Sequence, residues 1–481
     1  MAVSPALQGR GRTVLVLTYR WPPQGGGGVQ RTLKLVKYLS ELGWRCVVHT
    51  VANPYSRLWD PTLAEEVPEG LKVYRTSTLE YESMRASLVG LGSKVRNLLR
   101  GGGAPARVTD GSRKVPEQSG EIGTREALRR RGWVGRSEDW LWSRVLVPDP
   151  QIVWAKLALP SALRIVREEK ASVLYSTSPP NSINVLALRL AEKANLPWVA
   201  DFRDPWTDGI RRRQWYPDNP ARERRELAWE RSIFEHANFV LATTVPTRDR
   251  FVEKYPWCPK DRVQVMTNGF DPADFSHVDG QERILEPELL HLSLSGNVET
   301  LFDLLPFLTA VREVLAADPD ARSLLRINFL GTKRQAHYDA AIEEFGIGDV
   351  IRFHAYMPHE RVVQMVAESD ALMLCQIPAK ESGGMKLPGK MFEYLYTRKP
   401  ILALTIPGET TAVLDAARVG RVVNPNDTAG IRAELEQFLY EYRNGGLQSR
   451  ADEKVISSFD RKRQALRVAE LLDRAAFEGR R

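Results

Sequence analysis

Two glycines and two lysines lie close together in the stretch SGGMKLPGKMFE, which covers residues 382–393. Gly383 and Gly384 carry no Cβ, so their backbone amides can approach a bound anion closely. Lys386 and Lys390 add positive charge to the same stretch. Glycine amides beside lysines suit the binding of phosphate groups. We therefore predict that this stretch binds the diphosphate of a nucleotide.

A carboxylate follows on the same stretch. Glu393 lies three residues after Lys390, on a helix expected over residues 389–396 with Pro388 as its first helical residue. From there the carboxylate can accept hydrogen bonds from two hydroxyls of a ribose. The alternative is a surface glutamate that pairs with Lys390 along the helix.

A second charged group lies in the segment DFRDPW at residues 201–206. It follows an expected strand, Trp198-Val-Ala, and so lies at the carboxyl edge of a sheet. Asp201, Arg203 and Asp204 can hold sugar hydroxyls or a phosphate there, and one aspartate can serve as a base. The alternative is an ion-pair network between Arg203 and Asp204 that shapes the loop.

A glycine loop lies near the start of the chain. Gly26, Gly27 and Gly28 follow a strand and open a helix, so backbone N–H groups and the helix N-terminus can face an anion. A nicotinamide cofactor is disfavoured because position 30 is Gln30 and because the next strand ends in TVAN without an acidic residue. A purely structural turn after two prolines is the other alternative.

Alternating strands and helices must position these groups. The first series has strands near residues 13–18, 46–50, 172–177, 198–200 and 239–243, and the second has strands near residues 291–295, 326–330, 351–354, 371–375, 401–404 and 420–423. Such alternation predicts parallel sheets. We therefore expect an α/β fold of two Rossmann-like, doubly wound domains that face a central cleft.

The expected boundaries are residues 1–280 for the first domain, 281–455 for the second, and 456–481 for a C-terminal helix that packs back on the first. A basic insertion at about residues 78–147 interrupts the first domain, and its middle is rich in Gly, Arg, Ser and Pro. Within it, Met84 to Arg100 has the pattern of a basic amphipathic helix. This helix either lies on an anionic membrane or packs on its own domain.

Composition narrows the class of protein. The 481 residues are 43% hydrophobic, which suffices for two cores, and no apolar run approaches the length of a membrane span. The N-terminus lacks the pattern of a signal peptide, and the three cysteines are far apart, so we expect a cytoplasmic protein without a metal site. The formal net charge of +8 suits an anionic partner.

These segments resemble the retaining glycosyltransferases of family four, which have the GT-B fold. The resemblance covers nearly the whole chain apart from the insertion. It rests on four segments in family order: the first strand with its Pro-Pro and glycine loop, DFRDPW at 201–206, TNGFD at 267–271, and PGKMFEY at 388–394.

The resemblance implies transfer of a sugar from a nucleoside diphosphate sugar to an acceptor hydroxyl with retention. It implies no cofactor and no obligatory metal. Asp201, Arg203 and Asp204 would be the catalytic group, with both aspartates orienting the acceptor, and backbone around Tyr356 and Pro358 would meet the nucleobase. The acceptor would be a glycan or a lipid-linked glycan in bacterial surface polysaccharide or glycolipid synthesis, at the inner face of the plasma membrane, with no nucleic acid partner.

The chain departs from the family pattern at three positions. Two glutamates usually lie eight positions apart; Glu393 matches the second, which holds the ribose, but the first is Met385. Donor-sugar contacts would then come from backbone of residues 383–385. An arginine and a lysine usually follow the first strand of the second domain, where this chain has Gly296, so the lysines or Arg203 would carry the charge. Arg203 itself stands where a histidine is common.

Two other functions stay open from these residues. One is a sugar-nucleotide epimerase of the same fold, and the other is an accessory subunit that binds a nucleotide sugar without turnover.

Overall fold

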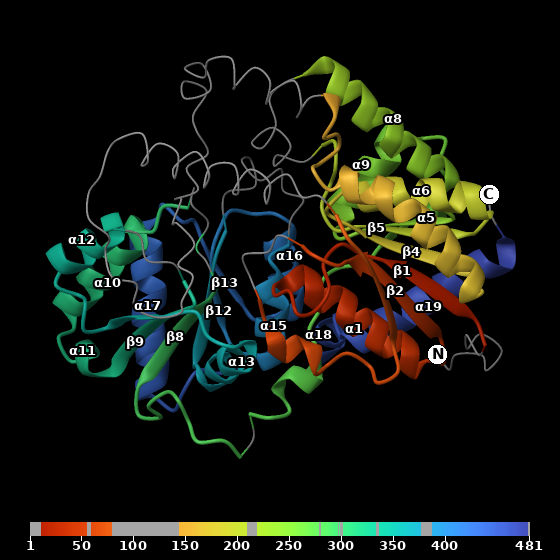
Figure 1. The fold of residues 1–481 in the computed structure, drawn as a ribbon. Coiled ribbons are helices and arrows are strands. Elements are labelled where there is room, and N and C mark those ends of the chain that lie inside the picture. The colour runs from red at the N-terminus through yellow and green to blue at the C-terminus, as the bar shows by residue number, and fades with distance from the viewer. Residues whose placement is uncertain are drawn as a thin grey trace, which may run out of the picture.

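The computed structural model describes residues 11–54, 59–78, 144–208, 219–278, 280–296, 298, 302–332, 336–376 and 387–479. Most of the expected insertion, including Met84 to Arg100, lies outside the described residues. So do Gly383, Gly384, Met385 and Lys386. The described chain forms two parallel sheets side by side, each with helices on both faces (Figure 1).

The first sheet has seven strands in the order β3-β2-β1-β4-β5-β6-β7. They are β1 (Thr13–Leu17), β2 (Arg45–Val51), β3 (Lys72–Thr76), β4 (Val173–Ser178), β5 (Trp198–Phe202), β6 (Phe239–Ala242) and β7 (Val263–Val265). The inner strands read as continuous apolar runs because helices cover both faces of the sheet.

Two helical layers cover this sheet. Val14 and Val16 pack in one core with residues of α1 (Gly27–Glu41) and α19 (Arg461–Glu478). Leu15 and Leu17 lie in the core on the opposite face, with residues of α5 (Ile152–Glu168), α6 (Ser182–Ala194), α8 (Pro220–His236) and α9 (Val245–Lys254). The alternation of side chains along one strand thus feeds two separate cores.

The second sheet has six strands in the order β10-β9-β8-β11-β12-β13. They are β8 (Leu290–Ser295), β9 (Leu325–Leu330), β10 (Ile351–His354), β11 (Ala371–Cys375), β12 (Ile401–Leu404) and β13 (Gly420–Val423). One core contains residues of α10 (Leu305–Ala317), α11 (Ala321–Leu324), α12 (Ala336–Glu344) and α17 (Thr428–Arg443). The other contains residues of α13 (His359–Glu368), α15 (Gly389–Thr397), α16 (Glu409–Ala417) and α18 (Glu453–Ser457).

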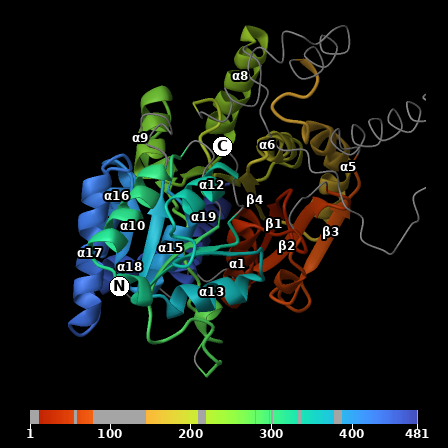
Figure 2. The same ribbon diagram turned by 90° about the vertical axis from the view of Figure 1, so that its left-hand side faces the viewer.

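The predicted fold class is confirmed, although three elements were missed. β3 is the edge strand of the first sheet (Figure 2), and its half-exposed side chains give no apolar run. α5 contains Pro160 in its interior, and a proline there argues against a helix when only the sequence is read. β7 is only three residues long. Three single-turn 3₁₀ helices complete the described elements: η2 (Pro61–Ala64), η3 (Lys260–Arg262) and η4 (Pro272–Phe275).

Two chain segments cross between the domains and pair with each other. Phe270 N–H donates to the backbone oxygen of Phe459 at 3.2 Å, and Arg461 N–H donates to the oxygen of Phe270 at 3.0 Å. Gly269 lies at the closest approach, where a Cβ would be 2.2 Å from the oxygen of Phe459. After this crossing, α19 packs against the first sheet. These two paired segments connect the two domains.

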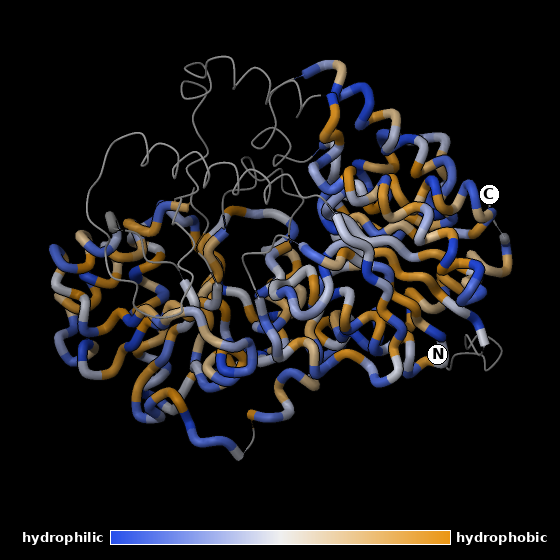
Figure 3. The backbone as a smooth tube through the Cα atoms, viewed as in Figure 1, coloured by the Kyte–Doolittle hydropathy of each residue, from blue (hydrophilic) through white to orange (hydrophobic). Residues whose placement is uncertain are grey.

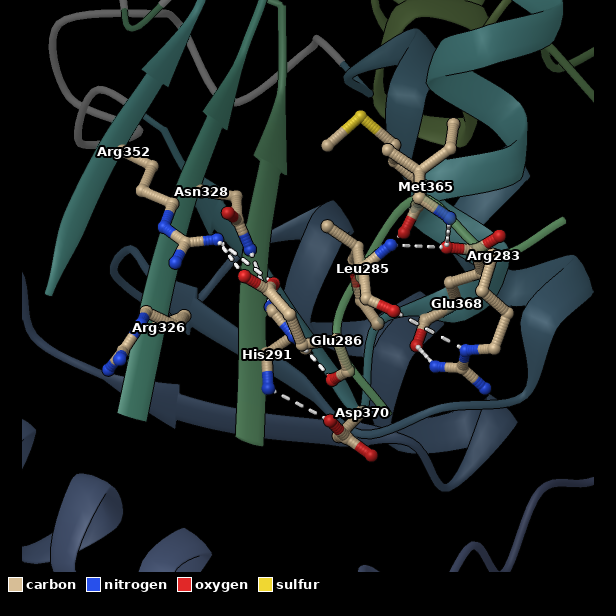
Figure 4. Close-up of polar contacts among 12 residues, drawn as sticks. Arg283, Leu285, Glu286, His291, Arg326, Asn328, Arg352, Met365, Glu368 and Asp370 are labelled. Carbon is tan, nitrogen blue, oxygen red and sulfur yellow. Dashed lines mark hydrogen bonds and ion pairs between the residues drawn. The ribbon is translucent and has the colours of Figure 1, made fainter. Parts of the chain in front are cut away.

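The linker that follows this crossing is held to the second domain by carboxylates (Figure 4). Glu368 accepts hydrogen bonds from the backbone N–H groups of Ile284 and Leu285, both at 2.8 Å. Glu286 contacts Arg352 through both of its oxygens, at 2.8 and 2.9 Å. These contacts fix the entry into β8, whose far end carries Gly296.

Hydrophobic residues concentrate within the two sheets and on the helix faces that cover them (Figure 3). Among the described residues, no helix is both long enough and apolar enough to cross a membrane. The three cysteines are buried as free thiols.

Replacement of Gly269 tests the crossing. Gly269→Ala places a Cβ against a backbone oxygen that cannot rotate away, so we expect a loss of about 1–3 kcal/mol in the free energy of unfolding. Urea unfolding followed by circular dichroism measures it. Gly348→Ala is the control, because its Cβ would meet only Ile342 at 3.7 Å. Equal stability of the two variants would contradict the crossing as described.

Candidate functional site

The glycine loop between β1 and α1 adopts a conformation that requires glycine. Gly26 has φ 103°, in the left-handed region, and α1 begins at Gly27. A Cβ on Gly28 would lie 2.3 Å from Nη1 of Arg203. The loop is therefore built around the arginine from the DFRDPW segment.

Arg203 holds this loop by its backbone. Its guanidinium donates to the carbonyl oxygens of Gly28 at 2.9 Å, Ser178 at 3.0 Å and Pro179 at 2.6 Å. Burial lowers the pKa of Arg203 to about 10, which still leaves it charged at neutral pH. Arg203 thus joins the carboxyl end of β4 to the start of α1, and this geometry gives it a positioning role.

Asp201 is fully buried and its carboxylate is occupied. Arg31 of α1 contacts both oxygens, from Nε at 3.1 Å and from Nη2 at 3.0 Å. The hydroxyls of Tyr175 and Thr177 also donate to it, at 3.0 and 2.9 Å. All of these contacts are internal, so the geometry favours a structural role for Asp201. Asp204, partly exposed at the same edge, is better placed to meet a ligand.

Arg31 extends this cluster to the segment between the domains. Its Nη1 donates to the oxygen of Thr267 at 2.6 Å and its Nη2 to the oxygen of Met266 at 2.9 Å. Burial lowers the pKa of Arg31, but the adjacent Asp201 carboxylate outweighs it and the net shift is upward. The ion pair therefore ties α1, β5 and the interdomain segment together.

The carboxyl edges of the two sheets meet. Val245 N–H, just after β6, donates to the Glu409 carboxylate, just after β12, at 3.4 Å. Burial raises the pKa of the Tyr356 phenol in the second domain. The carboxylate of Asp60, in the first domain, is close enough to add to this rise. Groups at the ends of the strands in both domains therefore share one region.

In the second domain, α15 directs three polar side chains to this region. Nζ of Lys390 lies 3.7 Å from the position of a Cβ on Gly296, whose φ is 72°. The hydroxyl of Tyr394 accepts from Ser295 N–H at 2.7 Å and donates to its Oγ at 3.1 Å. Tyr394 thus fixes the end of β8, and the structure brings the predicted Gly296 and Lys390 together.

The sequence suggested a ribose or Lys390 as the partner of Glu393, but the structure shows another partner. His359, the first residue of α13, donates from Nε2 to Oε1 of Glu393 at 3.2 Å. Tyr356 and Pro358 precede α13, and the Tyr356 side chain is 66% exposed. Pro388 lies just before α15 instead of within it, because its ψ of 130° is extended.

The structure therefore gathers Gly26, Gly27, Gly28 and Arg203 at one sheet edge and Gly296, Tyr356, Pro358, Lys390 and Glu393 at the other. Within the described residues, no group of three or more His, Cys, Asp or Glu side chains is arranged to hold a metal ion.

Sequence reasoning missed four residues that organise these edges: Arg31, Tyr175, His359 and Tyr394. One signal was available. Arg31, Lys34 and Tyr38 follow the helical spacing of a buried stripe on α1, and all three are buried. Polar residues on a stripe that faces the core need internal partners. For His359 no local signal exists, because its partner lies on another helix.

Comparison with known proteins finds a family match over part of the chain. Residues 123–274 match the sequence profile described as Glycosyltransferase Family 4. The chain is similar to this family over these residues, which make up less than half of its length. The matched residues run through β4 to β7 and include Asp201, Arg203 and the interdomain segment up to η4.

A curated relative is similar in sequence to part of this chain. WcaL of Salmonella typhimurium, described as a colanic acid biosynthesis glycosyltransferase, is 23% identical over 218 residues. That alignment covers 45% of this chain and 52% of WcaL, so the chain spans about half the length of this relative.

Two solved structures share the fold across the whole chain. Sucrose-phosphate synthase from Thermosynechococcus elongatus has a TM-score of 0.56 at 12% identity and covers 96% of this chain and 98% of its own. Anabaena HepE, solved in complex with UDP, has a TM-score of 0.56 at 12% identity. The alignment covers 95% of this chain and 98% of HepE. The likeness shows the GT-B fold.

Replacement of Asp201 separates a structural from a catalytic role. Asp201→Asn leaves the Arg31 charge buried without its counterion, and we expect a loss of about 3–5 kcal/mol in stability. Thermal unfolding measures it. Asp249→Asn, which removes an exposed pair with Arg248, should cost less than about 1 kcal/mol. A stable Asp201→Asn protein would argue against the structural role.

Proposed function

We propose that this chain is a retaining glycosyltransferase that moves a sugar from a nucleoside diphosphate sugar to an acceptor hydroxyl. One observation carries the proposal: a single helix, α15, brings Lys390 beside Gly296 and presents Glu393 at the same sheet edge. A cation next to a glycine backbone suits a diphosphate. A carboxylate one turn away suits the two hydroxyls of a ribose.

The donor site belongs to the second domain in this proposal. Residues 281–455 bind the nucleotide sugar, with the backbone near Tyr356 and Pro358 at the base and Gly383 to Lys386 at the donor sugar and diphosphate. Residues 1–280 take the acceptor, and residues 456–481 return to the first domain. The UDP found in Anabaena HepE, which shares the fold, supports a nucleoside diphosphate as ligand.

The reaction needs a site that stabilises a leaving diphosphate. The bond between the anomeric carbon and the diphosphate oxygen breaks, a bond from that carbon to the acceptor oxygen forms, and the acceptor proton passes to the leaving phosphate oxygen. Negative charge builds on the diphosphate, so preorganised cations and amides there lower the barrier. Lys390 and the N-terminus of α1, held by Arg203, meet this need.

Asp204 is the carboxylate that we assign to the acceptor. It lies partly exposed at the carboxyl edge of the first sheet, whereas Asp201 is buried beneath it. In this arrangement Asp204 accepts a hydrogen bond from an acceptor hydroxyl. Asp201 and Arg203 act through the loop and the helix that they hold.

The acceptor that we propose is a glycan or lipid-linked glycan of a surface polysaccharide, met at the cytoplasmic face of the plasma membrane. Likeness to WcaL supports this pathway class. The formal net charge of +8 supports approach to an anionic lipid surface.

Product analysis tests the reaction class. The purified protein is incubated with UDP, GDP, ADP or dTDP sugars, first alone and then with a lipid-linked glycan acceptor. Transferred sugar with retained configuration supports the proposal. A sugar epimer formed without acceptor would indicate an epimerase, and binding without any product would indicate an accessory subunit.

Loss of the Glu393 carboxylate should weaken nucleotide binding. We expect Glu393→Ala to raise the Kd for the bound nucleoside diphosphate at least about tenfold, or about 1.4 kcal/mol, because a charged acceptor for ribose hydroxyls is lost. Isothermal titration calorimetry measures it. Glu436→Ala on α17, which removes a half-exposed surface pair with Arg432, should leave the Kd unchanged. Equal Kd values for both variants would remove Glu393 from the site.

A further inference from the structure

The pair of His359 and Glu393 connects the two chain segments assigned to the nucleotide. His359 directly follows Tyr356-Met357-Pro358, the segment placed at the base, and Glu393 is the carboxylate placed at the ribose. Nε2 of His359 lies 3.2 Å from Oε1 of Glu393, and both side chains are largely buried, at 20% and 18% exposed. An ionised carboxylate only accepts, so the imidazole nitrogen is the donor.

Charged groups of both signs surround this pair. The Arg461 guanidinium, at the start of α19, interacts with the carboxylates of Asp274, Glu393 and Asp271. Lys34 of α1 contacts three carboxylates, those of Glu66, Asp271 and Asp274. Lys34 and Arg461 together face four carboxylates, those of Glu66, Asp271, Asp274 and Glu393. Burial raises the pKa of Asp274, which shows how costly charge is at this place.

Asp274 also faces His359. The 3₁₀ helix η4, which carries Asp274, packs against α13, which carries His359. The charged groups near the imidazole are Glu393 from α15, Asp274 from η4 and Lys34 from α1. Burial lowers the pKa of His359, but Glu393 and then Asp274 outweigh it, and the pKa is raised.

The imidazole, together with Arg461, offsets the repulsion between the Glu393 carboxylate and the nearby Asp274 carboxylate. Like charges in a partly buried region repel strongly, because water screens them poorly. The hydrogen bond from His359 to Oε1 fixes the direction of the Glu393 carboxyl group.

We propose that His359 is a positioning residue for the nucleotide sugar: it holds the Glu393 carboxylate toward the ribose and balances the charge of the neighbouring acidic cluster. The inference rests on the proposed function. His359 acts through Glu393 and makes no contact with the reacting atoms.

A double-mutant cycle tests the coupling. The Kd for the nucleoside diphosphate that the wild type binds, among UDP, GDP, ADP and dTDP, is measured for His359→Ala, Glu393→Ala and the double variant. We expect His359→Ala to raise the Kd about threefold or more in the wild-type background and less than about twofold once Glu393 is alanine. The same change in both backgrounds, or no change in the first, overturns the proposal.

Two further variants keep the test independent of folding. His359→Gln keeps an N–H donor and should recover part of the lost affinity. His277→Ala is the matched control, since His277 contacts only the backbone oxygen of Glu360 on an exposed surface at 3.1 Å. It should leave the Kd unchanged. Equal losses for His359→Gln and His359→Ala would mean that the hydrogen bond plays no part.

The pH dependence gives a readout that a packing role would not produce. The imidazolium form pairs best with the carboxylate, so this contact is present below the raised pKa of His359 and weakens as the pH rises through it. The affinity of the wild type relative to His359→Gln should therefore fall between about pH 6 and about pH 9, and titration of the phosphate cancels in the ratio. A constant ratio contradicts the charge role. A wild type that binds none of the four nucleotides overturns the proposed function itself.

Discussion

The buried ion pair of Arg31 and Asp201 is the interaction on which the arrangement of the two domains depends. Arg31 lies on the first helix and Asp201 lies near the carboxyl end of β5. The remaining donors of Arg31 reach the backbone of Met266 and Thr267. A buried charge is tolerated only when its partners are complete. Helix, sheet and interdomain segment must therefore be in place together, and each specifies the position of the others.

The crossing of the two interdomain segments follows from this anchoring. Gln464 of α19 donates to Thr267 and to the oxygen of Asn268 at 3.1 and 3.0 Å, so both segments are held to the first domain. Gly269 provides the room for their approach. The segment TNGFD, one of the four segments that resemble the family, thus has a structural explanation: each of its polar residues anchors the connection between the domains.

Charge is distributed unevenly around the proposed nucleotide site. At the glycine loop, Arg203 uses its donors on backbone oxygens, which makes it a scaffold for α1. At α15, Lys390 lies next to Gly296, where charge would develop in a transfer reaction. Between them, the acidic cluster around Lys34 adjoins His359 and Glu393. The cations that position the chain and the cation assigned to the ligand are thus different residues.

The sequence by itself determined the fold class and the place of the candidate site. Apolar strand runs, glycine loops and the helix start near Pro388 are local patterns, and they placed Gly28, Lys390 and Glu393 at the edges of sheets. Only the tertiary structure decided what those residues contact. Arg31 and Asp201 are 170 positions apart, and His359 and Glu393 are 34 apart on different helices. Local patterns reflect backbone propensity and burial, whereas the partner of a buried charge depends on which elements pack together, and that is settled only when the chain has folded.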